Sequence, residues 1–340
     1  MKPKISLIVP CYNVEKYLPT CFESIKNQTF RDFEVIFVND ASTDNTGIMI
    51  QEFIHGKQFA KCYEHSVNKG IGETRNTGLK HSNGEFVTFY DPDDIIHPNF
   101  LEVIYNTIVL YDADMAVCNF KSVKNNKFLL CSEYGATSKV EVIEGNENCL
   151  DAFFRIDNYL GWASWNKIYR SKIIKDYQIN FGAIRWSEDS FFNASYIIKC
   201  KKVVLNHAVL YQYVQHPDSL LHIKFSTSHF TVYKYMLNLL RNNYSEILEK
   251  NIRIYFARIT HDSLYRSVNA FSRGYRNKKD LLKLIKMLSY DLNFLKKYKV
   301  TYYISLWERI CLIYYKVRVF FMRDNGEELS EELNFDYTII

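Results

Sequence analysis

Short runs rich in β-branched and aromatic residues alternate with segments of helical periodicity through the first part of the chain. This alternation is the pattern of βα units, which build a mainly parallel sheet. The strand-like runs lie at residues 6–9, 33–38, 61–65 and 85–90, and the helix-like segments between them at residues 14–27, 44–55 and 72–81. We therefore expect an α/β domain, which a chain of 340 residues is long enough to build around a large core.

Mostly polar residues follow each of these four runs. They are Pro10 to Asn13, Asn39 to Ser42, Ser66 to Asn68 and Asp91 to Asp94. Ligands of open α/β sheets bind beyond the carboxyl ends of the strands. The sequence therefore predicts that amide, carboxylate and aromatic side chains from four loops converge on one crevice.

Asp91 and Asp93 end the fourth predicted strand, and side chains two apart on an extended backbone point to the same side. Two such carboxylates form a candidate site for Mg²⁺ or Mn²⁺, which take oxygen ligands and share them with substrate phosphate. A nucleotide diphosphate would suit this site. The alternative is a turn in which Asp94 caps a helix at residues 97–111. Spacing alone leaves both interpretations open.

Asp40 and Arg75 are further candidates for ligand binding. Asp40 can accept hydrogen bonds from a nucleobase, although the nearby Ser42 or Asp44 can equally cap the next helix. Arg75 follows Gly70-Ile71-Gly72 at the start of a predicted helix, where its guanidinium can bind an anion. Because an arginine occupies the position of the third glycine, this is no dinucleotide-binding fingerprint, and the pattern argues against a Rossmann oxidoreductase.

Five segments occur in a characteristic order, at residues 10–18, 24–29, 38–44, 75–79 and 91–94. Together they resemble family-2 glycosyltransferases of the GT-A fold, and the resemblance extends over residues 1 to about 220. It implies an inverting enzyme that moves a sugar from a nucleotide-diphosphate donor, expected to be a UDP-sugar, to an acceptor hydroxyl. Asn39 stands where the family usually has a second aspartate, which makes the base preference less secure.

The resemblance also implies roles for single residues. It assigns the metal, Mn²⁺ or Mg²⁺, to Asp93, with Asp91 near the ribose or a metal-bound water. His216 is a further candidate for contact with the ion or the diphosphate. The nucleotide pocket carries over to Pro10, Tyr12, Asp40, Asn68 and Arg75.

An acidic pair, Glu188 and Asp189, matches the family segment that holds the general base, and Asp189 is the candidate for that role. A carboxylate can take the proton of the attacking hydroxyl. The alternative for Glu188 is a carboxylate that stabilises the first turn of a helix. Trp162 and Trp165 either line the acceptor site or pack in the core.

We expect two domains, a GT-A catalytic domain at residues 1–222 and an all-helical extension at residues 223–340. Further strands at 115–120, 203–205 and 209–214 and a helix at 146–157 are expected to belong to the first domain. A basic, amphipathic helix at residues 302–321 can dock on an anionic membrane surface, or it can pack on the catalytic domain or a second subunit.

The acceptor is expected to be a glycan or a lipid-linked glycan of cell-surface polysaccharide synthesis, such as capsule, O-antigen or exopolysaccharide. Eight scattered cysteines fit a reducing cytoplasm, and no apolar run reaches the ~18 residues of a membrane span. We therefore expect a cytoplasmic protein that can associate with the inner face of the plasma membrane.

Three other functions were weighed. A sugar-nucleotide pyrophosphorylase would need a glycine-rich basic loop after the first strand, which Pro10 to Asn13 does not supply. A non-catalytic nucleotide-sugar or carbohydrate-binding module would bind a donor without turning it over, and would be indifferent to loss of Asp189. Nucleic acid is not expected as a partner, because the net charge of +5 is modest and no nucleic-acid-binding motif is present.

Overall fold

The computed structural model describes residues 2–124, 139–154, 163–182, 184, 187–215 and 235. The chain divides into two compact units, and nearly all of these residues belong to the first, which comprises Met1–Phe153 and Asp157–Ser219. The predicted helical extension, with its proposed membrane-docking helix, lies outside the described residues except for residue 235. The predicted boundary between residues 222 and 223 therefore stays a prediction.

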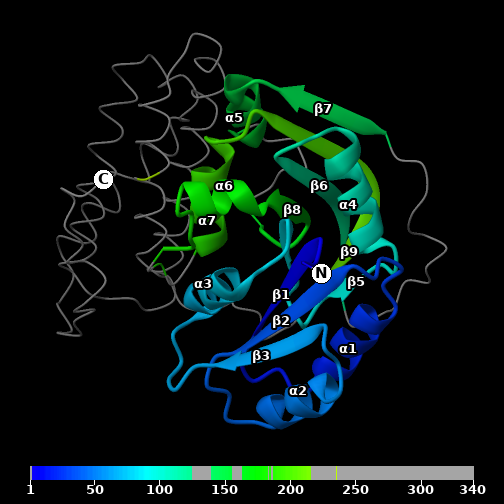
Figure 1. Cartoon of the computed structure of the whole chain (residues 1–340), viewed down its shortest axis with the longest axis vertical. Helices are drawn as coiled ribbons and strands as arrows, with labels where there is room; N and C mark the ends of the chain where they lie inside the picture. Colours follow the sequence, from blue (N-terminus) through cyan, green and yellow to red (C-terminus); the bar gives the residue numbers. More distant parts are fainter. Residues whose placement is uncertain are drawn as a thin grey trace, which may run out of the picture. The chain divides into compact units, whose positions relative to one another are not determined.

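The described elements alternate as the sequence predicts (Figure 1). The strands are β1 (Ile5–Cys11), β2 (Phe33–Asn39), β3 (Ala60–Glu64), β4 (Phe86–Phe89), β5 (Ile95–Ile96), β6 (Met115–Lys124), β7 (Val140–Glu144), β8 (Lys167–Arg170) and β9 (Lys202–Gln215). The helices are α1 (Leu18–Lys26), α2 (Thr46–Ile54), α3 (Ile71–His81), α4 (Phe100–Leu110), α5 (Asn146–Phe154), α6 (Ser171–Asp176) and α7 (Glu188–Ile197).

The strands form one mixed sheet in the order β3-β2-β1-β4-β8-β6-β9-β5, with β7 also paired to β9. The first four strands in this order are mutually parallel, and β6 and β9 are parallel to each other. β8 lies antiparallel between β4 and β6. The expected α/β fold with a mainly parallel sheet is therefore confirmed.

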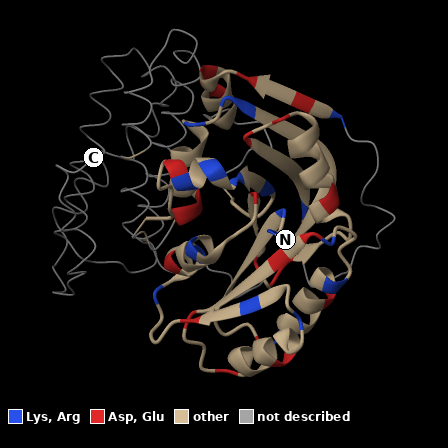
Figure 2. Ribbon diagram, in the orientation of Figure 1, with Lys and Arg blue, Asp and Glu red and all other residues tan. Residues whose placement is uncertain are grey.

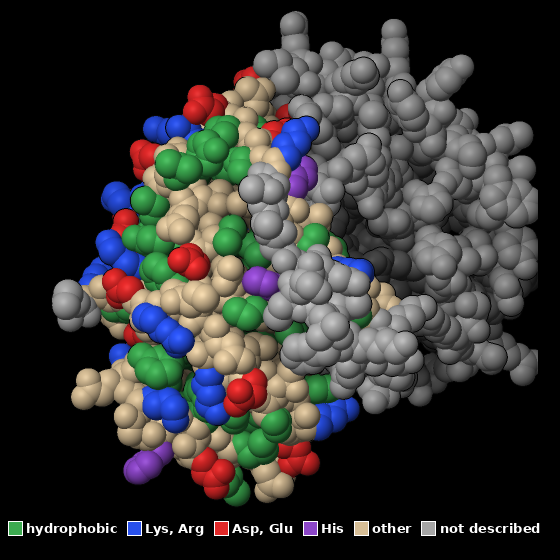
Figure 3. Space-filling model, turned by 90° about the vertical axis from the view of Figure 1, so that its right-hand side faces the viewer, with side chains coloured by type: hydrophobic (Ala, Val, Ile, Leu, Met, Phe, Trp, Pro, Cys, Tyr) green, Lys and Arg blue, Asp and Glu red, His purple; other side chains and the backbone are tan. Residues whose placement is uncertain are grey.

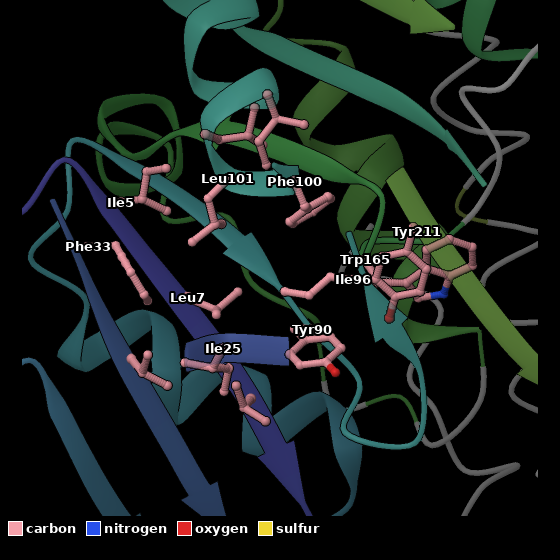
Figure 4. Packing of buried hydrophobic residues seen from close by; sticks show 14 of the residues in the cluster. Ile5, Leu7, Ile25, Phe33, Tyr90, Ile96, Phe100, Leu101, Trp165 and Tyr211 are labelled. Atoms are coloured by element: carbon pink, nitrogen blue, oxygen red, sulfur yellow. The ribbon is translucent and has the colours of Figure 1, made fainter. Parts of the chain in front are cut away.

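Alternate residues of the central strand β1 pack on opposite faces of the sheet, as the period of two requires. Ile5, Leu7 and Val9 belong to a core cluster that also contains the buried sides of α1, α2 and α4. Figure 4 shows part of this cluster, including Phe100 of α4 beside the sheet. This apolar face holds the four parallel strands in place and so fixes where their carboxyl ends lie.

The opposite face of the sheet packs against α3 and α7. A Cβ on Gly78 of α3 would lie 2.3 Å from Cγ2 of Ile8, so the helix touches β1 where only glycine fits. Beside it, Phe89 packs edge-to-face against Phe181 and Phe192, whose own rings are stacked. Close packing on this face brings the start of α7 to the side of α3.

Several elements differ from the sequence prediction. The strands expected at 203–205 and 209–214 are one long strand, β9, and a register shift beside Cys118 and Asn119 of β6 accounts for the interrupted pattern. The helix expected from residue 14 begins at Leu18, because the residues before it form a loop bonded to its neighbour. The short elements β5, β7, β8 and α6 were not predicted.

Charged side chains of both signs are interspersed with apolar ones on the face of the molecule in Figure 3. Within the described part of the chain, no helix combines the length and apolar character that a membrane crossing requires.

Candidate active site

Two loops at the carboxyl ends of β1 and β2 are joined by hydrogen bonds that run in both directions. The backbone N–H of Asn13 donates to Oγ of Ser42 (3.0 Å), and that of Thr43 donates to Oδ1 of Asn13 (2.8 Å). The N–H of Glu15 donates to Asp44, and that of Asn45 donates to Glu15. We call these bonded residues, 13–15 and 42–45, the loop clasp.

The loop clasp lies beside residues predicted to bind the nucleotide. Pro10 is the penultimate residue of β1, and Tyr12 follows that strand with 48 % of its surface exposed. Asn13 and Ala41 adopt positive φ values of 51° and 57°, a conformation in which glycine and asparagine are the usual residues. The loop clasp therefore holds Asn13 in a left-handed turn directly after the exposed Tyr12, and Ala41 adopts the same conformation directly before the second loop of the clasp.

Asp40 is only 2 % exposed, and its carboxylate organises the loop after β3. The backbone N–H groups of Lys69 and Gly70 donate to its two oxygens at 2.9 and 2.8 Å, and Nδ1 of His65 lies 2.6 Å from Oδ1. The same loop carries Asn68, which is exposed. Loops following three adjacent strands are thus linked to one another, as the convergence of strand ends predicts.

The loop with Asp91 and Asp93 is anchored through Asp94. The buried Asp94 carboxylate accepts hydrogen bonds from the Tyr211 hydroxyl (2.8 Å) and from the backbone N–H of Val214 (2.8 Å), both in β9. Burial, followed by the charges of Asp93 and Asp91, raises the pKa of Asp94 well above its usual range. The interpretation of Asp94 as a helix cap is wrong, because α4 begins only at Phe100 and the carboxylate is bound to β9.

Arg75 is the centre of an acidic cluster that joins three parts of the chain. Its Nη1 donates to Oε1 of Glu188 (2.9 Å) and to Oδ1 of Asp189 (2.7 Å), and its Nη2 donates to Oδ1 of Asp91 (3.0 Å). The side chain is 1 % exposed and lies over the ring of Phe181. The anions that it binds here are carboxylates of the chain itself. Figure 2 shows the acidic first turn of α7 beside α3.

The charges in this acidic cluster are unequal, because three carboxylates surround one guanidinium. Burial disfavours the charged form of Arg75, but Asp189, Asp91 and Glu188 outweigh it and raise the pKa of the guanidinium. Burial, reinforced by the charge of Asp189, raises the pKa of Glu188 to about 7. Burial also raises the pKa of Asp91. The cluster keeps an excess of negative charge that favours a cation.

The acidic pair of α7 is presented by a turn of unusual backbone conformation. Ser187, directly before Glu188, has a φ of 65°, and Glu188 and Asp189 form the first turn of the helix. Ser164 donates a hydrogen bond from Oγ to Oδ1 of Asp189 (2.8 Å). Both carboxylates therefore stand at a helix start and contact Arg75, which agrees with the helix-start interpretation of Glu188, and its catalytic role stays a prediction.

Trp165 packs in the core. Its ring stacks on Tyr211 at 4.3 Å and on Tyr213 at 5.7 Å between ring centroids, and only 7 % of the residue is exposed (Figure 4). This favours the packing interpretation of Trp165. Trp162 and His216 lie outside the described residues.

Among the described residues, no three His, Cys, Asp or Glu side chains lie together as a ready-made metal site. Asp91 and Asp93 lie in a turn after β4, in which the backbone N–H of Asp94 donates to the carbonyl oxygen of Asp91 (3.0 Å), so the predicted extended backbone at these residues is wrong. Their carboxylate oxygens are nevertheless ligands of the kind that Mg²⁺ and Mn²⁺ take. Such ions commonly take one or two protein carboxylates and complete their coordination with water and substrate phosphate.

Sequence reasoning identified Arg75, Asp91, Glu188 and Asp189 separately, and the structure brings these four together. It missed Ser164. It also missed His65, whose side chain contacts Asp40, and the buried Lys167, whose ammonium group contacts Asn166. Ser164 and Lys167 lie close in sequence to Trp162 and Trp165, but no spacing rule connects them to Asp189.

The mixed, mostly parallel sheet flanked by helices is the GT-A fold that the sequence predicts. The model of the family described as glycosyl transferase family 2 matches residues 6–176, and the chain belongs to this family.

Several similar proteins are bacterial glycosyltransferases. The chain is 32 % identical over 213 residues to glycosyltransferase GlyA of Streptococcus pneumoniae. The aligned region covers 62 % of this chain and 30 % of GlyA. It is 31 % identical over 223 residues to the putative glycosyltransferase EpsH of Bacillus subtilis, covering 64 % of this chain and 63 % of EpsH. The match thus spans less than two thirds of either relative.

Among solved structures, S. aureus TarS residues 1–349 in complex with UDP-GlcNAc has a similar fold. The TM-score is 0.68 at 22 % identity, and the alignment covers 93 % of this chain and 92 % of TarS. This likeness concerns the fold.

Proposed function

We propose that this protein is an inverting glycosyltransferase that moves a sugar from a UDP-sugar to an acceptor hydroxyl. The observation that carries the proposal is the acidic cluster, in which Arg75 joins Asp91 of the Asp-Pro-Asp segment to Asp189, the candidate base. Membership of glycosyl transferase family 2 supports the activity. The cluster supports the proposal because it holds Asp91, expected near the ribose or a metal-bound water, and Asp189, the candidate base, on the same guanidinium.

The donor nucleotide is proposed to bind beyond the ends of β1 to β4. Tyr12 offers an exposed aromatic face for the base, while Asp40 and Asn68 are linked in one loop system beside it. Pro10 shapes the same edge, and Arg75 holds Asp91. We propose UDP as the nucleotide, because TarS, which shares the fold, was solved in complex with UDP-GlcNAc.

Asp93 and Asp91 would hold Mn²⁺ or Mg²⁺, and His216 stays a candidate for the same ion. When bound, the ion would supply positive charge that neutralises the diphosphate as it departs. Arg75 neutralises part of the charge of Asp91, Glu188 and Asp189, so the loop and the helix can approach each other.

Asp189 is proposed to act as the general base. The acceptor oxygen forms a bond to the anomeric carbon as the bond from that carbon to the diphosphate oxygen breaks, and the hydroxyl proton passes to the Asp189 carboxylate. Attack opposite to the leaving group inverts the anomeric configuration. Arg75 and Ser164 both donate to Oδ1 of Asp189 and so hold the orientation of its carboxylate.

The acceptor is proposed to be a glycan or lipid-linked glycan of cell-surface polysaccharide synthesis, as the sequence resemblance implies. The reaction would take place in the cytoplasm, at the inner face of the plasma membrane when the acceptor is lipid-linked.

Turnover of a panel of UDP- and GDP-sugars tests the proposal. Wild type, Asp93→Ala, Asp189→Asn and the control Asp32→Asn, which changes an exposed aspartate, are each assayed with Mn²⁺, Mg²⁺ or EDTA. We expect one donor to be hydrolysed with metal by wild type and control, and turnover to fall at least a hundredfold in both other variants. Metal-dependent UDP binding without turnover, even with candidate acceptors, would favour a binding module. Absence of metal-dependent UDP binding would refute the donor site.

A further inference from the structure

Lys167, the first residue of β8, is a completely buried lysine close to the acidic cluster. It is 0 % exposed, and its Nζ donates to the carbonyl oxygen of Ala163 (2.5 Å) and to Oδ1 of Asn166 (2.8 Å). Burial lowers the pKa of Lys167 to about 7. Burying an ammonium group is costly, and a neutral apolar side chain would fill the same space more cheaply.

The two acceptors of Lys167 belong to the turn at residues 163–166, so the lysine closes this turn against the start of β8. Hydrogen bonds also join this turn to α7. Nδ2 of Asn193 donates to the carbonyl oxygens of Ala163 (3.2 Å) and Asp189 (2.9 Å), and the Tyr169 hydroxyl donates to Oδ1 of Asn193 (2.7 Å). The turn and the first turn of α7 therefore form one hydrogen-bonded unit.

Within this unit, Ser164 reaches the carboxylate of Asp189. Its Oγ donates to Oδ1 of Asp189, the same oxygen that accepts from Nη1 of Arg75. Two donors on Oδ1 fix the plane of the carboxylate, while Oδ2 accepts no hydrogen bond from any residue that the structure describes. One oxygen is held by the protein and the other is left for a substrate proton.

We propose that Ser164 and Lys167 are positioning residues for the general base, with Ser164 holding Oδ1 of Asp189 and Lys167 holding the turn that presents Ser164. The inference rests on the proposed function, in which Asp189 removes the acceptor proton. A purely structural role for the same contacts would alter stability but leave the turnover of the folded protein unchanged.

The test compares Ser164→Ala and Lys167→Met with wild type, Asp189→Asn and Ser195→Ala. Ser195 is a matched control, because it is a serine of α7 whose Oγ donates to the carbonyl of Phe191. For each protein, kcat for metal-dependent hydrolysis of the identified UDP-sugar, the Kd of UDP by calorimetry and Tm are measured. We expect kcat to fall about tenfold in Ser164→Ala, the effect of one hydrogen bond to a charged group.

The Kd of UDP is expected to stay within about twofold in that variant, since the base does not touch the nucleotide, and Ser195→Ala should match wild type in both quantities. Lys167→Met should lower kcat in the same sense. If it does not fold, Ser164→Ala decides alone.

Two results would overturn the inference while leaving the proposed function intact. One is a Ser164→Ala kcat equal to that of the Ser195→Ala control while Asp189→Asn is inactive. The other is a parallel loss of kcat and UDP affinity, which indicates general disruption. Full turnover in Asp189→Asn would instead refute Asp189 as the base, and the positioning role would fail with it.

Discussion

Arg75 balances three carboxylates from two distant segments while being almost inaccessible to water. Each of these groups alone is an ordinary polar residue at a strand or helix end. Their energies are coupled, because removing the guanidinium leaves Asp91, Glu188 and Asp189 facing one another without a cation. The ion pairs therefore matter most because loss of the guanidinium would leave buried carboxylates without a positive partner.

We expect Arg75→Met to lower the free energy of unfolding by about 3–5 kcal/mol at pH 7, the usual cost of leaving buried charges unpaired. Urea denaturation followed by circular dichroism measures it. Arg31→Met is the control, since Arg31 is exposed. A cost equal to that of the control would show that the cluster is not electrostatically coupled.

Lys167 gives stability a characteristic pH dependence. Burial lowers its pKa to about 7 in the folded chain, against the usual 10.5 of an exposed lysine, so between these values the unfolded chain holds a proton that the folded chain has lost. Stability should therefore rise with pH above 7, by about 1 kcal/mol per pH unit from this group.

In Lys167→Met, this contribution is absent. The difference in unfolding free energy between wild type and the variant, measured in urea at pH 7, 8 and 9, should move in favour of wild type as the pH rises. A difference independent of pH would mean that Lys167 titrates normally in the folded protein.

Sequence reasoning found the reactive residue types but not their partners. Asp91 and Asp189 were recognisable from their segments, whereas the contact of both with Arg75 depends on how α7 packs against α3. Asp94 was misread for a related reason. Local chemistry favoured a cap, and a hydrogen bond from Val214 in β9, which no local pattern reveals, decided otherwise.

At the scale of elements, the loop clasp joins the β1–α1 and β2–α2 connections through side-chain to backbone bonds. Asn13 contributes a carboxamide acceptor and a positive φ, two separate properties that mutations can distinguish. Glycine removes only the first, while alanine removes the first and adds strain.

We expect Asn13→Gly to lower the free energy of unfolding by about 1 kcal/mol and Asn13→Ala by about 1 kcal/mol more. Chemical denaturation measures both. Gln178→Gly is the matched control, because Gln178 is exposed and has a φ of 52° outside these loops. Equal stability of the glycine and alanine variants would argue against strain at this position.

The alternating strands and helices of the first part were predictable because hydrophobic periodicity is local. The antiparallel strand β8 was not, since it has four residues and its place between β4 and β6 depends on pairing with distant residues. The sequence predicts two strands where the structure has the single strand β9, because the pairing of β9 with β6 shifts register in the middle.

At the scale of the whole molecule, ligand binding should report on the proposed donor site. A nucleotide that binds only the folded chain stabilises it, by about 2.7 kcal/mol at a hundredfold excess over Kd. We expect UDP with Mn²⁺ to raise Tm by several degrees, and UDP with EDTA to raise it less.

Asp93→Ala should lose the Mn²⁺-dependent part of this shift and keep the rest, which differential scanning fluorimetry can follow. ADP with Mn²⁺ serves as the nucleotide control for wild type. Equal shifts with and without metal would argue against an ion shared between the diphosphate and Asp93.

Strand β8 lies antiparallel between β4 and β6, where it separates β1 to β4 from the later strands, and this separation has an evolutionary consequence. All donor candidates except His216 precede it within residues 10–93, on the side of β1 to β4, while Asp189 comes from the later segment. The proposed donor residues therefore form one continuous block of sequence that recombination at residues 111–114 could transfer as a unit. The incoming segment would still have to pair Ile168 with Thr88 and supply the carboxylates of Glu188 and Asp189 to Arg75.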